Sequence, residues 1–249
     1  MDALANGGCV APKDEADLLL EASAAGRGPI DGLVSRRVRG EPLAWITGWV
    51  AFCGLRIRVD PGVFVPRPHT EALARRAVEL LLDAGRAVDL CTGSGAVAAV
   101  MRAARARADI LATDVDANAV MCARRNGVRA LLGDLDEPLP SRLDGTVDVV
   151  TAVVPYVPSE ELHLLPRDVV AHEPRIALDG GPGGTAVLFR AADSAARLLA
   201  PGGTVLLEIG GAQARHVVST FAQLEVAQIR VLRDGDGRER AIEARRPKR

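Results

Sequence analysis

Apolar and polar positions follow a helical period at the start of the chain and then switch to strand-like alternation. Residues 14–25 space their apolar side chains as an amphipathic helix that stops at Gly26, and residues 30–38 repeat the pattern over a shorter length. Residues 49–60 alternate apolar and polar side chains around Gly54, which is typical of a β-hairpin. The pattern therefore predicts a small N-terminal helical segment joined to the rest of the chain by a hairpin.

From Arg86 onward, short apolar runs alternate with helical patterns, and a helix is expected before them from about Thr70 to Ala84. Such alternation predicts a doubly wound α/β fold with a mostly parallel sheet. A turn at residues 234–237 within residues 230–245 predicts a closing antiparallel hairpin. The expected strands lie near Val88, Leu111, Ala130, Val149, Val205, Ile229 and Ala241.

These elements predict three parts of the chain. Residues 1–44 form the small helical segment, residues 45–69 the connecting β-hairpin, and residues 70–249 the α/β domain that carries the chemistry. The α/β domain is large enough to bury a core of its own.

The run Asp89-Leu-Cys-Thr-Gly-Ser-Gly95 separates the first apolar run of this domain from the helix-forming Ala96-Val-Ala-Ala-Val. Glycine permits a tight turn and close approach of a ligand, and the helix that follows presents unpaired N–H groups. Asp114, 21 residues after Gly93, ends the next expected strand. A carboxylate there is placed to accept hydrogen bonds from ribose hydroxyls, so the strand–turn–helix unit predicts a nucleotide-type cofactor site.

Two cofactor classes use this geometry, and the glycine spacing separates them. A dinucleotide site has a third glycine where this chain has Ala98 or a close neighbour. The run with an acidic residue at the strand end resembles instead the first motif of class I S-adenosylmethionine-dependent methyltransferases. In that resemblance Asp89 lies near the methionine end of the cofactor, Asp114 holds the ribose, and Cys91 occupies the position of the usual first glycine.

Five further motifs occur in the order and spacing of one family. They are Glu41-Pro-Leu-Ala-Trp-Ile-Thr-Gly48, Pro61-Gly-Val-Phe-Val-Pro-Arg-Pro-His-Thr-Glu71, Val153-Val-Pro-Tyr156, Glu173-Pro-Arg-Ile-Ala-Leu-Asp-Gly-Gly181 and Leu207-Glu-Ile-Gly210. Together they resemble the HemK/PrmC family of protein glutamine-amide N-methyltransferases. The resemblance implies methyl transfer from S-adenosylmethionine to a glutamine side chain of a release factor or a ribosomal protein.

The resemblance also implies the site residues. The acceptor site would be formed by Val153, Val154, Pro155 and Tyr156. The cofactor site would be formed by Asp89, Cys91, Thr92, Gly93, Ser94, Gly95, Asp114, Val115, Asp134, Leu135 and Val153.

Four polar residues of the neighbouring motifs have other expected roles. Arg67 and Thr70 are expected to close over the cofactor, with the alternative that the two prolines of this segment serve only to fix the crossover into the α/β domain. Glu173 and Arg175 are expected to form a structural ion pair that holds the loop after Tyr156.

The acceptor motif departs from the family pattern at two positions, because the family has Asn-Pro-Pro-Tyr where this chain has Val153-Val154-Pro155-Tyr156. An amide nitrogen is a poor nucleophile, so an acceptor such as the Asn side chain must orient it, and Val153 has none. Three hypotheses remain: a divergent protein glutamine methyltransferase, a small-molecule methyltransferase whose acceptor needs no amide clamp, and a cofactor-binding protein without turnover.

Composition narrows the class of partners. The 249 residues carry a net charge of −1 with a sequence pI near 6.4, which gives no electrostatic footprint for nucleic acid. The four cysteines and four histidines have no metal-ligand spacing, so no metal is expected. The sequence shows no signal peptide and no apolar run long enough for a membrane span, so a cytoplasmic location is expected.

Overall fold

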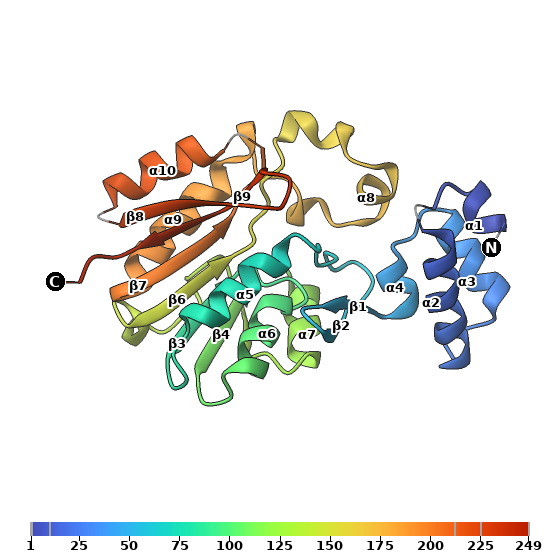
Figure 1. Cartoon of the computed structure of the whole chain (residues 1–249), viewed down its shortest axis with the longest axis horizontal. Coiled ribbons are helices and arrows are strands. Elements are labelled where there is room, and N and C mark those ends of the chain that lie inside the picture. The colour runs from blue at the N-terminus through green and yellow to red at the C-terminus, as the bar shows by residue number, and fades with distance from the viewer. Residues whose placement is uncertain (1, 10, 212, 225, 249) are drawn as a thin grey trace.

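A seven-stranded sheet forms the centre of the computed structural model, which describes residues 2–9, 11–211, 213–224 and 226–248 (Figure 1). Segments rich in Val, Leu and Ala supply its inner parallel strands, as expected for strands buried on both faces. In spatial order the strands are β5 (Ala130–Leu132), β4 (Asp109–Asp114), β3 (Arg86–Leu90), β6 (Val147–Ala152), β7 (Leu199–Glu208), β9 (Glu239–Arg245) and β8 (Ala227–Arg233).

The strand order reverses between β3 and β6. The chain winds outward from β3 through β4 to β5, returns to β6 on the other side of β3, and continues outward to β7 with parallel pairing throughout. Only the closing hairpin breaks the pattern, because β9 runs antiparallel to both β7 and β8. Ligands of open α/β sheets bind beyond the carboxyl ends of the strands at such a reversal, which here lies between β3 and β6.

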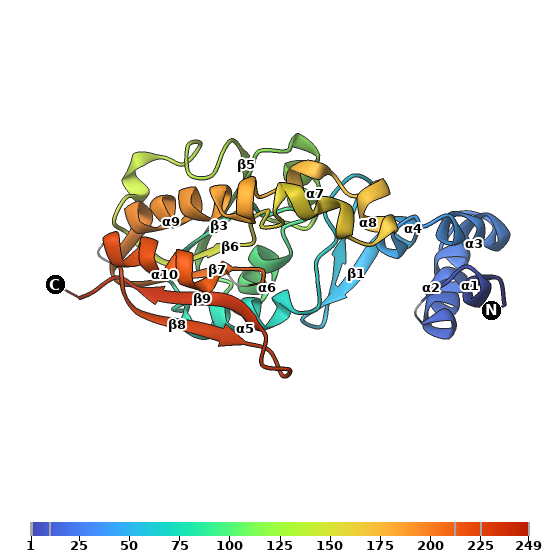
Figure 2. The same ribbon diagram turned by 90° about the horizontal axis from the view of Figure 1, so that it is seen from above.

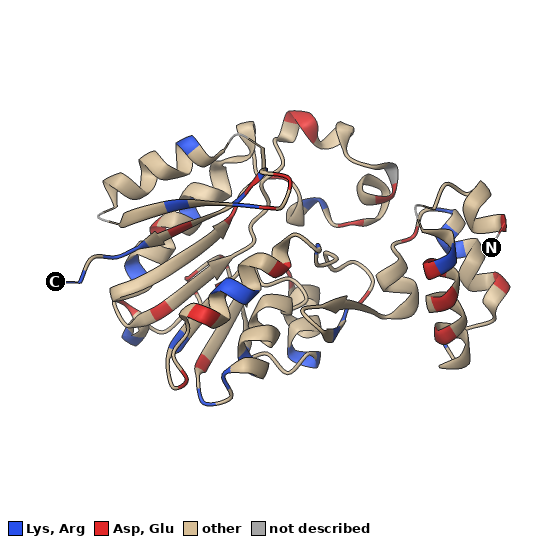
Figure 3. Cartoon of the chain, viewed as in Figure 1, with Lys and Arg blue, Asp and Glu red and all other residues tan. Residues whose placement is uncertain are grey.

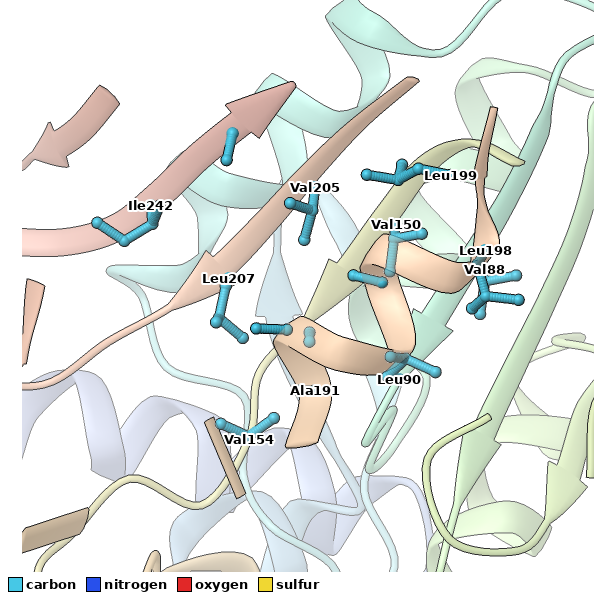
Figure 4. Close-up of a cluster of buried hydrophobic side chains, with 14 of the residues drawn as sticks. Val88, Leu90, Val150, Val154, Ala191, Leu198, Leu199, Val205, Leu207 and Ile242 are labelled. Atoms are coloured by element: carbon cyan, nitrogen blue, oxygen red, sulfur yellow. The ribbon is translucent and has the colours of Figure 1, made fainter. Parts of the chain in front are cut away.

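Helices cover both faces of the sheet (Figure 2). On one face, α5 (Thr70–Leu80), α6 (Ala96–Ala104) and α7 (Ala117–Arg125) share a buried apolar cluster with the sheet. On the other face, α9 (Ala186–Leu198) and α10 (Ala214–Gln223) pack into a second cluster. Figure 4 shows Ala191 and Leu198 of α9 facing Val150, Val205 and Leu207 of the strands.

The segment between β6 and α9 carries only short helices. They are η2 (Ser159–Leu164), α8 (Arg167–His172), η3 (Arg175–Ala177) and η4 (Pro182–Gly184), while η1 (Ser141–Leu143) precedes β6. Prolines at the first or preceding position start several of them, since proline fixes the backbone angle that a helix start needs.

Four helices at the N-terminal end form a cluster of their own (Figure 1). They are α1 (Asp2–Asn6), α2 (Pro12–Ala24), α3 (Ile30–Val38) and α4 (Leu43–Thr47). Leu4, Leu19, Leu33 and Ile46 are buried between them. The hairpin β1 (Trp49–Phe52) and β2 (Leu55–Arg58) follows, and the Trp45 indole donates to the Val63 carbonyl at 2.9 Å, so that α4 is held against the segment that leads into α5.

The expected α/β fold, all seven strands of the sheet and both hairpins are confirmed. The helix expected over residues 70–84 ends at Leu80, before the Asp83-Ala-Gly85 turn. Helices α1 and α4 were not predicted, because five residues are too few to show a helical period. Acidic and basic residues are interspersed over the elements (Figure 3), and no helix of the described residues has the length and apolar character needed to cross a membrane.

Candidate functional site

The glycine turn after β3 wraps around the carboxylate of Asp114 at the end of β4. The Gly93 N–H donates to Asp114 Oδ2 at 2.8 Å, and the Asp116 N–H donates to Oδ1 at 2.9 Å. Gly93 has φ of 56°, and a Cβ built on it would meet nothing within 4 Å. Gly95 has φ of 80°, and its Cβ would lie 2.9 Å from the Cβ of Ala123. Gly93 therefore leaves space for a ligand, whereas Gly95 lets α6 start against α7.

Asp89 lies at the same edge of the sheet and is almost completely buried. Its two oxygens accept from the hydroxyls of Thr92 at 2.5 Å and Thr151 at 2.6 Å. Burial raises the pKa of Asp89 to about 6, although the two hydroxyls oppose that rise. This pKa lies above the ordinary value of 3.8, so Asp89 ionises less readily in the folded state than in the unfolded state. The folded state therefore loses stability as the pH rises from 3.8 to about 6, and the full loss is present at pH 7. A cationic ligand group beside Asp89 would offset this cost.

One cavity of about 860 Å³ joins this edge to the end of β6. It is lined mostly by apolar side chains, and a pocket of this size and character is typical of small-molecule sites. Of the predicted site residues, Gly95 alone does not line it, because it packs against α7. The lining includes Asp89, Cys91, Thr92, Gly93, Ser94, Asp114, Val115, Asp134, Leu135, Val153, Val154, Pro155 and Tyr156.

The Val153–Tyr156 turn is held from behind by α10. The side-chain amide of Gln213 donates to the Tyr156 carbonyl at 2.8 Å and to the Gly184 carbonyl at 3.1 Å. Gly210 lies under the Tyr156 ring, since a Cβ there would come within 2.6 Å of it. Among the described residues, no hydrogen bond reaches the carbonyl oxygens of Val153 or Val154. The turn is thus fixed in position and keeps two backbone acceptors free.

Comparison of the chain with known proteins identifies its family. A family described as "Methyltransferase small domain" matches residues 54–133. A release factor glutamine methyltransferase of Geobacter sulfurreducens is 33% identical over 220 residues, covering 86% of this chain and 76% of that protein. The 4-amino-L-phenylalanine/4-methylamino-L-phenylalanine methyltransferase of Streptomyces pristinaespiralis is 38% identical, covering 76% and 68%.

The chain belongs to the release factor glutamine methyltransferase (HemK/PrmC) family. It is an S-adenosylmethionine-dependent methyltransferase. A solved methyltransferase from Pyrococcus furiosus has the same fold, with a TM-score of 0.57 at 21% identity over 79% of this chain and 91% of that one. The hypothesis of a binding protein without turnover is not supported.

The residues of this methyltransferase fit the cofactor. The buried Ser94 hydroxyl in the glycine turn has no hydrogen-bond partner, and it lines the cavity beside the open space at Gly93. Asp114 would accept hydrogen bonds from the ribose hydroxyls, and Asp89 would face the cationic methionine end. Bound there, S-adenosylmethionine would supply an electrophilic methyl group to the acceptor end of the cavity. The described residues contain no group of three or more His, Cys, Asp or Glu placed to hold a metal ion.

Asp134 is not a free carboxylate in this methyltransferase. Its Oδ2 accepts from Arg190 of α9 at 2.6 Å, and both residues line the cavity. Leu135 follows with φ of 47°, in the left-handed region, and is buried. The sequence analysis did not identify Arg190, because this residue belongs to none of the motifs and lies 56 residues from Asp134 along the chain.

The expected ion pair between Glu173 and Arg175 is wrong. Glu173 is buried and accepts from Arg67 at 2.7 Å, whereas Arg175 is exposed and pairs with Asp179 four residues on. The i,i+4 spacing favours Asp179 as the partner of Arg175, and the segment before α5 brings Arg67 to Glu173. Arg67 and Thr70 do line the cavity. The Arg67 ion pair ties the segment before α5 to the segment after α8.

Sequence reasoning also missed the histidine between Arg67 and Thr70. His69 lines the cavity, and its Nε2 lies 3.3 Å from Oε1 of the buried Glu208. Both residues stand inside motifs that carry the family resemblance, but nothing in either motif shows that they meet.

Cys91 has φ of 54°, which strains a residue with a Cβ. We expect Cys91→Gly to raise the free energy of unfolding by about 1 kcal/mol, because relief of the strain outweighs the added chain entropy. Urea unfolding of the wild type and the variant measures this difference in the free energy of unfolding. Cys9→Gly is the matched control, since Cys9 has no positive φ, and it should lower stability. Equal losses in both variants would show that Cys91 is unstrained.

Proposed function

We propose that this methyltransferase methylates the side-chain amide nitrogen of a glutamine in a protein of the release-factor type, with a ribosomal protein as the other possible substrate, in the cytoplasm. The observation that carries the proposal is the Val153–Tyr156 turn, which lines the same cavity as the glycine turn. Several similar curated proteins, including that of Geobacter sulfurreducens, are named release factor glutamine methyltransferases.

The turn offers what an amide acceptor requires. The lone pair of an amide nitrogen is delocalised into its carbonyl, so the NH₂ group reacts only if hydrogen-bond acceptors orient it towards the methyl group. The carbonyl oxygens of Val153 and Val154 are free for this purpose among the described residues. The Tyr156 ring, fixed over Gly210, forms a wall beside them. Backbone acceptors therefore take over part of the role of the family's Asn side chain.

A small-molecule amine is the second candidate acceptor. Val153 contributes an apolar side chain where an amide clamp would stand, and it packs against the apolar cluster of α5 and α6. An amine has a localised lone pair and needs no clamp. The Streptomyces pristinaespiralis relative, named for a methyltransferase of 4-amino-L-phenylalanine, shows that such an activity occurs among similar proteins.

Labelled S-adenosylmethionine separates the two candidates. Purified enzyme is incubated with a release factor domain, with the same domain carrying Gln→Ala at the candidate site, or with 4-amino-L-phenylalanine. We expect label in the release factor that disappears with Gln→Ala. Label in the amine alone would replace the first candidate by the second, and no label in any acceptor would contradict both.

A further inference from the structure

His69 and Glu208 form a histidine–carboxylate pair at the acceptor end of the cavity. We propose that His69 accepts the proton that the acceptor nitrogen loses on methylation, and that Glu208 holds and stabilises the protonated ring. The inference rests on the proposed function and applies to either acceptor class, since an amide and an amine both release a proton from nitrogen when they are methylated.

The two ring nitrogens of His69 have different surroundings. Nε2 is buried 3.3 Å from Glu208 Oε1 and makes no hydrogen bond of good geometry in this position. Nδ1 is not among the buried unpartnered atoms, the side chain is 26% exposed, and the ring lines the cavity. The nitrogen next to the carboxylate is thus placed to donate, and the other nitrogen is left to accept a proton from the cavity.

The pairing of β6 with β7 places Glu208 beside Val153, the first residue of the acceptor turn. Ala152 pairs with Leu207, so Val153 and Glu208 follow directly at the carboxyl ends of the neighbouring parallel strands β6 and β7. Side chains alternate between the faces of a sheet. Since Leu206 and Val153 both pack into the cluster of α5 and α6, Glu208 shares that face with Val153. His69, directly before α5, reaches Glu208 from that same side.

The other groups at this end of the cavity are less suited to take a proton. Burial, and secondly the Glu208 carboxylate, raise the pKa of Tyr156, so its hydroxyl stays protonated. Both oxygens of Asp89 accept threonine hydroxyls. Glu173 is engaged by Arg67. The imidazole of His69 is the remaining side chain at this end of the cavity, among the described residues, whose ring nitrogen can accept a proton.

Charged groups face His69 from several of the elements packed against it. Arg67, which is paired with Glu173, lies two residues away on its own segment, and His69 itself stands at the amino end of α5. Arg240 of β9 adds positive charge near Tyr156. Glu208 lies opposite Nε2 and is the carboxylate that would hold the protonated ring. A histidine held by a carboxylate in this way is the arrangement used in general base catalysis.

The step balances as a proton transfer. As the nitrogen–methyl bond forms, the sulfur–methyl bond of S-adenosylmethionine would break and leave its electron pair on sulfur, with S-adenosylhomocysteine as the leaving group. The N–H bond of the acceptor breaks, its electron pair stays on nitrogen, and the proton goes to Nδ1 of His69. The imidazolium then carries protons on both nitrogens, with the Nε2 proton donated to Glu208. Return of the Nδ1 proton to solvent restores the neutral ring.

His69→Gln tests the proposal, because glutamine can still donate to Glu208 but cannot take up a proton. We expect kcat for the methylated acceptor to fall by about 100-fold, as general base catalysis contributes 10²–10⁴-fold. The Kd for S-adenosylmethionine, measured by calorimetry, should change by less than about twofold, because the fold and cofactor site persist. In His69→Ala, added imidazole should restore at least about one tenth of the wild-type rate by replacing the lost base.

The exposed His163 lies outside the cavity lining, so His163→Gln is the matched control and should leave kcat unchanged. A wild-type rate in His69→Gln overturns the proposal. It is equally overturned if His69→Gln loses cofactor affinity together with activity and imidazole does not rescue His69→Ala, which indicates a structural role. A wild type that methylates neither the release factor nor 4-amino-L-phenylalanine overturns the proposed function, and this inference with it.

Discussion

Val153→Asn should raise methylation of a release factor glutamine by about 10- to 100-fold, because one aimed polar contact at a reacting centre contributes about 3 kcal/mol. The Asn oxygen would join the carbonyls of Val153 and Val154 in orienting the amide NH₂ group. Methylation of an amine should instead fall, since an unmatched amide would be buried in an apolar wall. The two acceptor classes thus predict changes of opposite sign at one position.

Initial rates on a release factor domain and on 4-amino-L-phenylalanine, in wild type and variant, measure this difference. Val170→Asn is the matched control, because Val170 is 52% exposed and does not line the cavity. If Val153→Asn alters neither rate, Val153 does not face the acceptor and the assigned acceptor site is wrong.

Asp114→Ala should weaken S-adenosylmethionine binding at least tenfold, which corresponds to about 1.4 kcal/mol. Burial raises the pKa of Asp114, but the N–H groups of Asp116 and Gly93 oppose the rise and favour the ionised form that ribose hydroxyls require. The substitution also leaves the Gly93 N–H without its acceptor and loosens the glycine turn. Loss of a charged hydrogen-bond acceptor alone accounts for about 1.5–3 kcal/mol.

Isothermal titration calorimetry with S-adenosylmethionine checks this value. Asp109 begins the same strand at its other end and is half-exposed, so Asp109→Ala changes the same residue type without touching the cavity. Binding by Asp114→Ala equal to that of Asp109→Ala would exclude Asp114 from the cofactor site.

Local pattern accounts for what could be predicted from the sequence. The strands around Val88 and Val149 are short segments rich in apolar residues between turn residues, and the glycine turn stands directly between a strand and a helix, so each was visible within a dozen residues. Their assembly follows from the right-handed βαβ connection. The α/β sheet and the place of the cofactor turn were therefore accessible without coordinates.

The partners of the polar site residues were not accessible, because they depend on contacts between distant segments. Glu173 meets Arg67 across 106 residues and Asp134 meets Arg190 across 56. No periodicity links such pairs, and the nearer i,i+4 partner of an ionic residue is the natural first guess. Gly95 was assigned to the cofactor for a related reason: a glycine motif shows that a Cβ is excluded, but not whether a ligand or Ala123 excludes it.

The place of β9 in the sheet has a consequence for synthesis on the ribosome. β8 is made before β9, yet it pairs only with β9, which lies between it and β7. Until residues 239–245 leave the exit tunnel, β8 has no partner and the edge of β7 stays open, although the glycine turn and the acceptor turn have already emerged. An open apolar edge invites pairing with other chains. Completion of β9 therefore closes this edge, and a chain truncated before residue 239 would keep it open.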